Sequence, residues 1–490
     1  MSFKLIVPLV FVSCYACGSQ GGAPDASGGG NAAQAGGGSM TPSAGSSSGG
    51  GGSSASGNGS GTGGVGGSAG QAASTGGAAA AGGNSSAGAS TGGTSFVPGG
   101  GAGGGAALPP LDCGADGWAV ENHGNPKNRV NYLILADGYT AATVETTLKE
   151  HIQAAFHERF DLEKGEPYGR YRNFVNICVM KAVSQSDGIG NGPTAFDGGN
   201  GGDRLAAVNE TKVNAYIKAN VPATFEVDWK AVVLNQNKWE NTGAYLMLWS
   251  GAGTDAPGAA LHEGGHGFHQ LADEYGSQTG CLGQKASCGA SGTVNQEVNS
   301  AGNCTTTDGK WDLWLGTTQK GLKVPDLGAT GVQGTWLGSR YVGDGQYRPS
   351  CNSMMNSLFG TSVDTSFNSV SREQMIFSIW RAVTPIDSTD PPAGPVTNPA
   401  SLTVNVVDPA VINVDWTIDS ATTVNGGTSF STSALTAGTH MISAKAYDNA
   451  SMDLVKQRSG VCPASVKGDY CKATNWSRSI QTVSWTVTKP

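Results

Sequence analysis

The sequence has little charge, no basic cluster and no long apolar run. Only 13% of its 490 residues are Asp, Glu, Lys or Arg, about half the share found in ordinary globular proteins. The net charge is −8. Without a basic run, this balance excludes a protein that binds nucleic acid by neutralising phosphates.

The low charge comes mainly from residues 18–108. This stretch holds nearly half of the 77 glycines, mixed with Ala, Ser and Thr, and Asp25 is its single charged residue. So few large apolar side chains cannot offset the entropy of ordering the chain. We therefore expect a disordered Gly/Ser/Ala-rich linker here, followed by a part that is long enough for two or three domains.

Residues 1–17 are typical of an export signal. Lys4 precedes an apolar run, 5–12, that is too short to cross a bilayer as a helix. Cys14 and Cys17 both lie where bacterial lipoprotein signals place the lipidated cysteine. We favour Cys17, because it leaves eight cysteines, an even set suited to disulfides in an oxidising compartment. The expected location is the cell envelope, as a lipoprotein of the outer membrane or cell surface, or otherwise outside the cell.

Strand and helix patterns alternate after the linker. Apolar runs predict buried strands, and apolar residues at helical spacing predict amphipathic helices between them. The strands are expected at 131–136, 174–183, 230–235 and 244–249, and the helices at 144–155 and 203–220. This order predicts an α/β layer.

The last of these strands leads into the sequence H-E-G-G-H, which begins at His262. On a helix, His262 and His266 lie on one face within reach of a single ion, and Glu263 lies beside a water bound to that ion. Thr254 or Asp255 can cap this helix. The spacing is that of catalytic zinc sites in peptidases, and it predicts one catalytic Zn²⁺ with Glu263 as the base.

A catalytic zinc site needs a third protein ligand. Asp273 and Glu274 are the nearest downstream carboxylates, and the helix must end near Gly267 for either to reach the ion. We favour Asp273 and keep Glu274 as the alternative. His269 shares the helical face of the ligands, and we expect it to be a supporting or surface residue.

Further candidates lie in residues 346–356. Met354 or Met355 could form a floor beneath the histidines, although Met more often fills gaps in a core. Tyr347 is a candidate catalytic residue, since its hydroxyl could donate a hydrogen bond to a developing oxyanion, and Tyr275 is a second candidate.

These segments resemble the IgA-peptidase family of zinc metalloendopeptidases. The matching motifs are Asn128-Arg129, Asp137-Gly138-Tyr139, H-E-G-G-H, L-A-D-E-Y at 271–275 and R-P-S-C-N-S-M-M at 348–355. The resemblance implies a zincin-type catalytic domain at 109–386, with the histidines and one of the two carboxylates as zinc ligands. Metzincin-like relatives usually have Gly where this chain has His269.

The chain beyond the catalytic domain predicts a second module. A helix at 371–383 with a Ser371-x-x-Gln374 capping box ends the first domain, and 387–399 reads as a proline-rich linker. Short alternating strands then predict an immunoglobulin-like β-sandwich at 400–490. Cys462 with Cys471 and Cys281 with Cys288 are plausible disulfides.

Two functions follow from these patterns. The first is a secreted or lipid-anchored zinc endopeptidase, expected as a monomer, that cleaves extracellular proteins or peptides. The second is a surface binding or scaffold lipoprotein with a structural or vestigial zinc site. Glu263 favours the first function, because a structural site does not need that carboxylate.

Overall fold

The computed structural model describes most of the chain from Leu108 onward. The described residues are 108–202, 205–238, 240–276, 297–298, 311–317, 331–356, 366–419, 422–456 and 476–490. The predicted signal peptide with Cys14 and Cys17, nearly all of the predicted linker, and the two proposed cysteine pairs lie outside these ranges.

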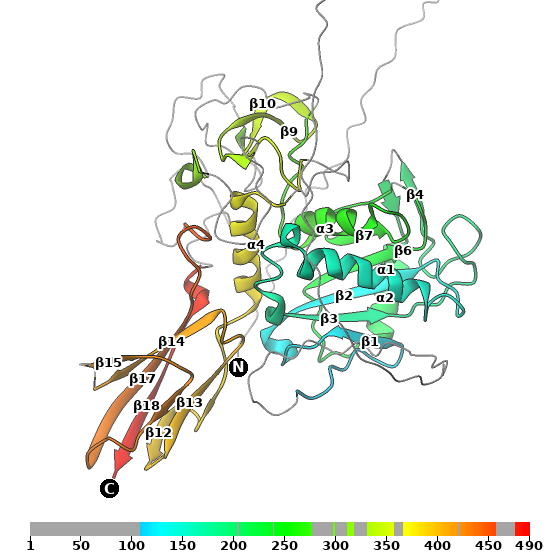
Figure 1. The fold of residues 1–490 in the computed structure, drawn as a ribbon. Coiled ribbons are helices and arrows are strands. Elements are labelled where there is room, and N and C mark those ends of the chain that lie inside the picture. Colours follow the sequence, from blue (N-terminus) through cyan, green and yellow to red (C-terminus); the bar gives the residue numbers. More distant parts are fainter. Residues whose placement is uncertain are drawn as a thin grey trace, which may run out of the picture. The chain divides into compact units, whose positions relative to one another are not determined.

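A five-stranded sheet forms the centre of the first domain (Figure 1), in the order β1-β3-β2-β6-β7. The strands are β1 (Gly117–Glu121), β2 (Val130–Asp137), β3 (Val175–Met180), β6 (Trp229–Leu234) and β7 (Leu246–Ser250). Only β1 runs antiparallel to its neighbour. Every residue of β2 and β3 is buried, as expected for parallel strands covered on both faces.

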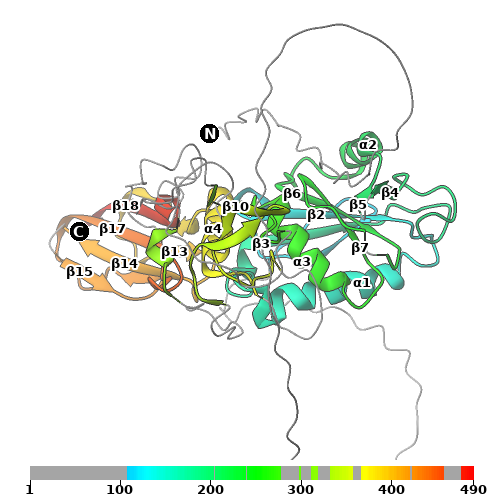
Figure 2. The same ribbon diagram turned by 90° about the horizontal axis from the view of Figure 1, so that it is seen from above.

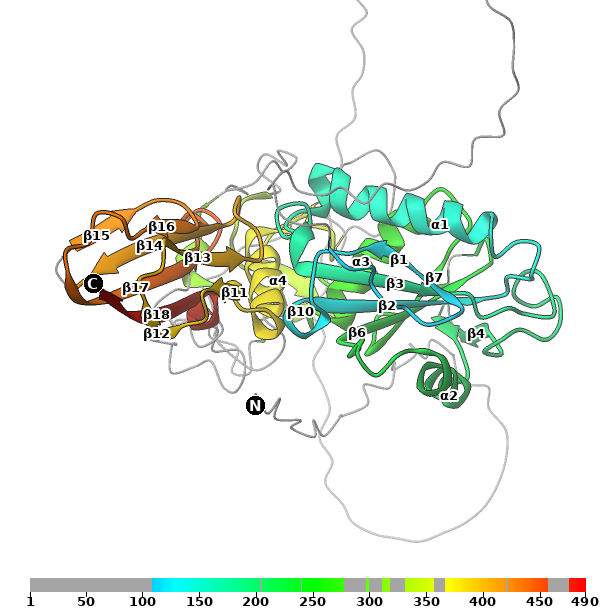
Figure 3. The same ribbon diagram turned by 90° about the horizontal axis from the view of Figure 1, so that it is seen from below.

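Helices cover both faces of this sheet. The helices α1 (Thr147–Phe156) and α3 (Ala256–Gly267) lie on one face, and α2 (Glu210–Asn220) lies on the other (Figures 2 and 3). Side chains alternate accordingly along β2: Tyr132 and Ile134 belong to the core under α1 and α3, whereas Leu133 and Leu135 belong to the core under α2. The mixed α/β arrangement predicted from the sequence is therefore correct.

The helix predicted at 203–220 is shorter than expected. It begins only at Glu210, because the Asn209 side chain accepts a hydrogen bond from the Lys212 backbone and caps the helix there. The residues before it form a small hairpin of β4 (Gly199–Gly202) and β5 (Leu205–Ala207). The apolar Leu205 suggested a helical stripe, but it is exposed on this hairpin.

A second small sheet and a long helix follow α3 in the chain. The sheet has the order β8-β10-β9, with β8 (Glu297–Val298), β9 (Trp336–Ser339) and β10 (Val342–Arg348). Helix α4 (Ser369–Ala382) begins earlier than the predicted capping box, because Asn368 caps it by accepting a hydrogen bond from the Ser371 backbone. Short helical turns occur at Pro126–Asn128, His157–Asp161, Glu163–Gly165, Arg172–Phe174, Asp312–Trp314 and Ser477–Ser479.

Two sheets form the C-terminal part. One has the order β11-β13-β16 and the other β12-β18-β17-β14-β15. Their strands are β11 (Ile386–Asp390), β12 (Gly394–Thr397), β13 (Ser401–Val406), β14 (Ile412–Ile418), β15 (Thr422–Asn425), β16 (Ser429–Ser431), β17 (Gly438–Asp448) and β18 (Ile480–Lys489). The predicted linker at 387–399 thus contributes two strands, each paired on one side only, where proline is tolerated. An immunoglobulin-like class stays a prediction.

The C-terminal sheets contact the first domain through a buried carboxylate. Asp448, at the end of β17, accepts hydrogen bonds from the Tyr171 hydroxyl at 2.5 Å and from the Trp380 indole at 3.0 Å, and it pairs with Arg170 at 2.9 Å. Elsewhere a disulfide joins Cys113 to Cys178 on β3. No helix among the described residues is long and apolar enough to span a membrane.

Candidate metal centre

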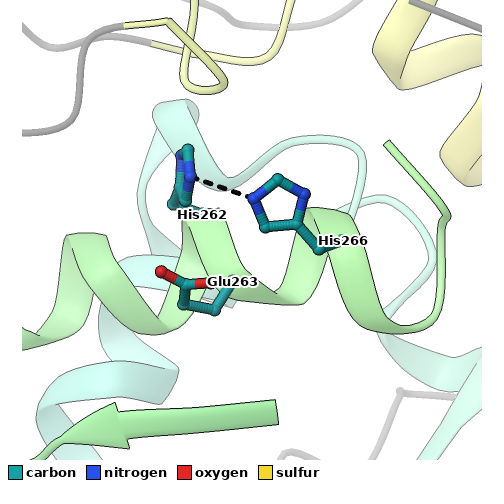
Figure 4. Close-up of side chains that lie close together, drawn as sticks. All are labelled: His262, Glu263 and His266. Atoms are coloured by element: carbon teal, nitrogen blue, oxygen red, sulfur yellow. Dashed lines mark hydrogen bonds between the residues drawn. The ribbon is translucent and has the colours of Figure 1, made fainter. Parts of the chain in front are cut away.

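The H-E-G-G-H sequence lies on α3, as predicted. Asp255 lies at the N-cap position, where its side chain makes no capping hydrogen bond, and Pro257 lies in the first turn, where proline is compatible with a helix. Figure 4 shows the His262 and His266 imidazoles facing each other across one turn, with Glu263 beside them. Ligand atoms of these three side chains lie within 4.8 Å of one another.

Both imidazoles are held by backbone carbonyls. His262 Nδ1 donates to the Met354 carbonyl at 2.8 Å, and His266 Nδ1 donates to the Leu271 carbonyl at 2.7 Å. Because each Nδ1 carries the donated proton, each Nε2 is left to offer a lone pair. The Nε2 atoms lie 3.2 Å apart.

The chain reverses directly after α3. Gln270 has a positive φ of 59°, and the Leu271 backbone donates to the Gly265 carbonyl at 2.9 Å. This turn brings Asp273 back over the helix, so that its Oδ1 lies 3.1 Å from the Nε2 atoms of both His262 and His266. The reversal that a third ligand requires is therefore made at Gln270, one residue after His269.

The Nε2 atoms of His262 and His266 and Asp273 Oδ1 are spaced as three ligands of a tetrahedral zinc site would be, with the fourth position open. Ligand atoms at 2.0–2.1 Å from zinc, in tetrahedral geometry, lie about 3.3–3.4 Å from each other. The separations of 3.2, 3.1 and 3.1 Å between the two Nε2 atoms and Asp273 Oδ1 are close to this value. The donor set of two neutral imidazoles and one carboxylate is also one that catalytic zinc uses.

The electrostatics of the site match its geometry. Burial alone would lower the pKa of His266, but the adjacent Asp273 carboxylate raises it to about 9. Burial also opposes ionisation of Asp273, yet the two histidines hold the pKa of its carboxyl far below the usual range. The site therefore favours an ionised Asp273 carboxylate that faces a positively charged group.

Glu263 is buried next to this group. Its side chain is 8% exposed, and within the described part of the chain no protein group donates a hydrogen bond to its carboxylate. Burial raises the pKa of Glu263, and the Asp273 charge adds to the rise while the two histidines oppose it. A buried carboxylate without donors is costly, so its presence calls for a chemical reason.

Glu274 points elsewhere, although it is adjacent to Asp273. Its carboxylate accepts hydrogen bonds from Ser353 Oγ at 2.5 Å and from Asn368 Nδ2 at 2.9 Å, and Ser371 Oγ lies at 3.4 Å. Its backbone donates to the Met355 carbonyl at 2.7 Å. The structure thus places Asp273 with the histidines and Glu274 in a separate polar cluster.

The remaining candidates occupy different surroundings. Met355 is fully buried beneath α3, and Met354 supplies the carbonyl that holds His262. Tyr347 is fully buried on β10, and its hydroxyl has no hydrogen-bond partner among the described residues, so nothing places it with the histidines.

His269 makes its contacts on a different side, away from the candidate ligands. It is buried, and its Nε2 is 2.7 Å from the Tyr168 hydroxyl in an aromatic cluster that includes Trp229. Burial, with the positive charges of Arg159 and Arg381, holds the pKa of His269 well below its usual value.

Close packing explains the three glycines that lie near the histidines of α3. A Cβ at Gly265 would lie 2.7 Å from Met355 Sδ, and one at Gly264 would lie 3.0 Å from Arg159 Nη2. One at Gly267 would lie 2.9 Å from the Ala244 carbonyl. Each glycine therefore lets α3 approach the elements around it, which offsets the weak helix propensity of glycine.

Two tyrosines lie at the outer side of Asp273. The Tyr341 hydroxyl donates to Asp273 Oδ2 at 3.0 Å, and the Tyr275 hydroxyl is 2.7 Å from that of Tyr341. Tyr275 was a candidate from sequence, whereas Tyr341 was missed. Nothing in the sequence around Tyr341 marks it, because its position depends on a turn that contains neither Gly nor Asn.

Fold and site together define a mixed α/β protein with a candidate metal centre of two histidines and one carboxylate. Residues 119–327 match the model of the IgA Peptidase M64 family. This match supports the resemblance to that peptidase family which the motifs suggested. No curated protein matches the chain.

Proposed function

We propose that the protein is a zinc-dependent endopeptidase that hydrolyses peptide bonds of extracellular proteins. The observation that carries this proposal is the position of Glu263. Its carboxylate is buried and has no donor among the residues that the structure describes, and it lies next to three atoms spaced as zinc ligands. A site that served only to hold a structural ion would need a fourth ligand and would have no use for such a carboxylate.

Each side chain of the site has a distinct task in this reaction. His262 and His266 offer Nε2 because backbone carbonyls hold their Nδ1 protons, and Asp273 offers Oδ1. Zinc bound there would lower the pKa of a water and polarise the scissile carbonyl. Glu263 takes a proton from the attacking water and passes it to the leaving amine, for which a raised pKa is suited.

Export and lipid anchoring form part of the proposal. They are supported by the signal-like residues 1–17, by Cys17, and by the nearly uncharged stretch that follows. The disulfide between Cys113 and Cys178 suits an oxidising compartment. A lipid at Cys17 and a long linker would hold the enzyme at the envelope while leaving it room to reach protein substrates.

The variant Glu263→Gln tests the proposed chemistry. We expect it to retain bound metal, since Glu263 is not a ligand, and to lose about 10²–10⁴-fold in the rate of hydrolysis of an unfolded protein substrate. Glu210→Gln, on the exposed start of α2, is the matched control and should be fully active. Cleavage by metal-loaded Glu263→Gln at the wild-type rate would refute the assignment.

A further inference from the structure

A strained turn carries Tyr341 to the metal centre. Arg340 and Tyr341 form the two-residue connection between β9 and β10, and both have positive φ, 49° and 65°. Two-residue hairpins of this kind favour Asn and Gly, and positive φ is unfavourable for a bulky side chain. Strained residues persist where the surrounding structure holds them, often at functional sites.

Backbone hydrogen bonds fix this turn to the segment that carries Asp273. The Arg340 backbone donates to the Asp273 carbonyl at 3.1 Å, and the Tyr341 backbone donates to the Tyr275 carbonyl at 2.9 Å. Gly276 permits the close approach, since a Cβ there would lie 2.5 Å from the Val342 carbonyl. The turn at Arg340–Tyr341 is therefore held directly against the segment that carries Asp273.

The side chains divide the Asp273 carboxylate between two tasks. Oδ1 lies 3.1 Å from both histidine Nε2 atoms, whereas Oδ2 accepts the Tyr341 hydroxyl proton at 3.0 Å. Because Tyr341 uses its only proton for Asp273, Tyr275 must be the donor in the 2.7 Å contact between the two phenols. A short chain of hydrogen bonds thus runs from Tyr275 through Tyr341 to Oδ2.

We propose that Tyr341 is a positioning residue that keeps Asp273 a one-oxygen metal ligand, with Tyr275 acting through it. A carboxylate can bind a metal ion with one oxygen or with both, and a donor on Oδ2 favours the first mode. That mode keeps a position open for water in a site with three protein ligands. The inference rests on the proposed function, because it requires a metal at His262, His266 and Asp273.

Packing alone does not account for this arrangement. Tyr341 is 63% exposed, so its ring contributes little to the core, and glycine would adopt the positive φ of this turn with less strain. The hydroxyl is the part of the side chain that reaches the site. Removing the hydroxyl alone, in Tyr341→Phe, therefore separates positioning from packing.

The test is metal binding by the full chain, measured with Zn²⁺ and Co²⁺ on wild type, Tyr341→Phe, Tyr275→Phe and the control Tyr447→Phe. Tyr447 lies on β17, in the C-terminal sheets, and is partly buried. We expect Tyr341→Phe to bind zinc about 10–100-fold more weakly, as is typical when a partner of a ligand is lost, and Tyr275→Phe to show a smaller loss. The Co²⁺ absorption of Tyr341→Phe should shift towards a higher coordination number, because the freed Oδ2 can also bind.

The outcomes separate this inference from the proposed function. Wild type that takes up no metal would overturn both. Wild type that binds zinc, together with Tyr341→Phe of equal affinity and an unchanged Co²⁺ spectrum, would overturn this inference alone. Tyr447→Phe should match wild type, and a loss equal to that of Tyr341→Phe would also contradict it.

Discussion

Two neighbouring carboxylates occupy opposite kinds of polar site. Asp273 Oδ1 lies near the Nε2 atoms of His262 and His266. Both imidazoles donate their Nδ1 protons to backbone carbonyls, so three acceptor atoms converge on one point. Glu274, the next residue, accepts hydrogen bonds from Ser353 and Asn368, and its charge also interacts with that of Arg348.

The difference shows how to recognise a metal centre without its ion. Lone pairs that face each other at 3.1–3.2 Å repel unless a proton or a cation lies between them. The Glu274 carboxylate is compensated by protein groups alone, namely hydroxyl and amide donors and the charge of Arg348, and its hydrogen bonds link neighbouring segments. Under the proposed function, the Asp273 side binds the metal and the Glu274 side supports the fold.

Removing the charge of Asp273 should have the largest effect. We expect Asp273→Asn to lower zinc affinity by more than about 100-fold, beyond the 10–100-fold typical of losing a ligand's partner, and to abolish hydrolysis. The change keeps the shape of the side chain, so the fold should persist. Zinc titration against a competing chelator measures the loss, and near wild-type affinity would remove the distinction between the two carboxylates.

The stability of the metal-free protein should depend on pH through the contact between His266 and Asp273. The folded pKa of His266, about 9, is above its ordinary value of 6.5. Its contribution to stability is therefore fully present below about pH 6.5 and is lost as the pH rises through about 9. Thermal unfolding of chelator-treated protein at a series of pH values measures this, and His266→Gln should flatten the decline. Stability that rises through this window would contradict the pairing of His266 with Asp273.

Changing Glu274 should lower the stability of the protein and leave its zinc affinity largely unchanged. In Glu274→Gln some donors from Ser353, Asn368 and Ser371 lose their acceptor, which should lower the free energy of unfolding by about 1–3 kcal/mol. Denaturant unfolding measures this loss. Zinc affinity of the folded protein should change far less than in Asp273→Asn, and an equal loss would show that both carboxylates serve the metal.

Replacing two glycines of α3 by alanine should give the smallest effects, with opposite signs at Gly265 and Gly258. A Cβ at Gly265 would strike Met355 Sδ at 2.7 Å, whereas a Cβ at Gly258 would meet nothing within 4 Å. We expect Gly265→Ala to destabilise the protein by about 1–3 kcal/mol through overpacking. Gly258→Ala should stabilise it by up to about 1 kcal/mol through helix propensity. Equal effects of the two changes in thermal unfolding would argue against the close contact with Met355.

Local patterns made the strands and the histidine helix predictable. The apolar run at 131–136 and the spacing of His262 and His266 each depend on residues near in sequence. The choice between Asp273 and Glu274 could not be read so directly. It depends on the positive φ of Gln270 and on donors from Ser353 and Asn368, about 80 to 95 residues further along the chain.

Capping and long-range contacts account for the differences from expectation. Asn209 sets the start of a helix that apolar spacing had placed earlier, and Asn368 sets the start of a helix that the Ser371 capping box had placed later. Tyr341 reaches Asp273 through a turn in which Arg340 and Tyr341 both have positive φ. Neither residue type favours such angles, so the sequence does not indicate this turn.

The most direct test is the metal content of the purified full chain, measured for wild type, Glu263→Gln and Asp273→Asn after dialysis against trace zinc. We predict one zinc per chain for wild type and for Glu263→Gln, and little or none for Asp273→Asn. Zinc retained equally by Asp273→Asn, or absent from wild type that still hydrolyses protein, would contradict the assignment of His262, His266 and Asp273 as the ligands of a catalytic ion.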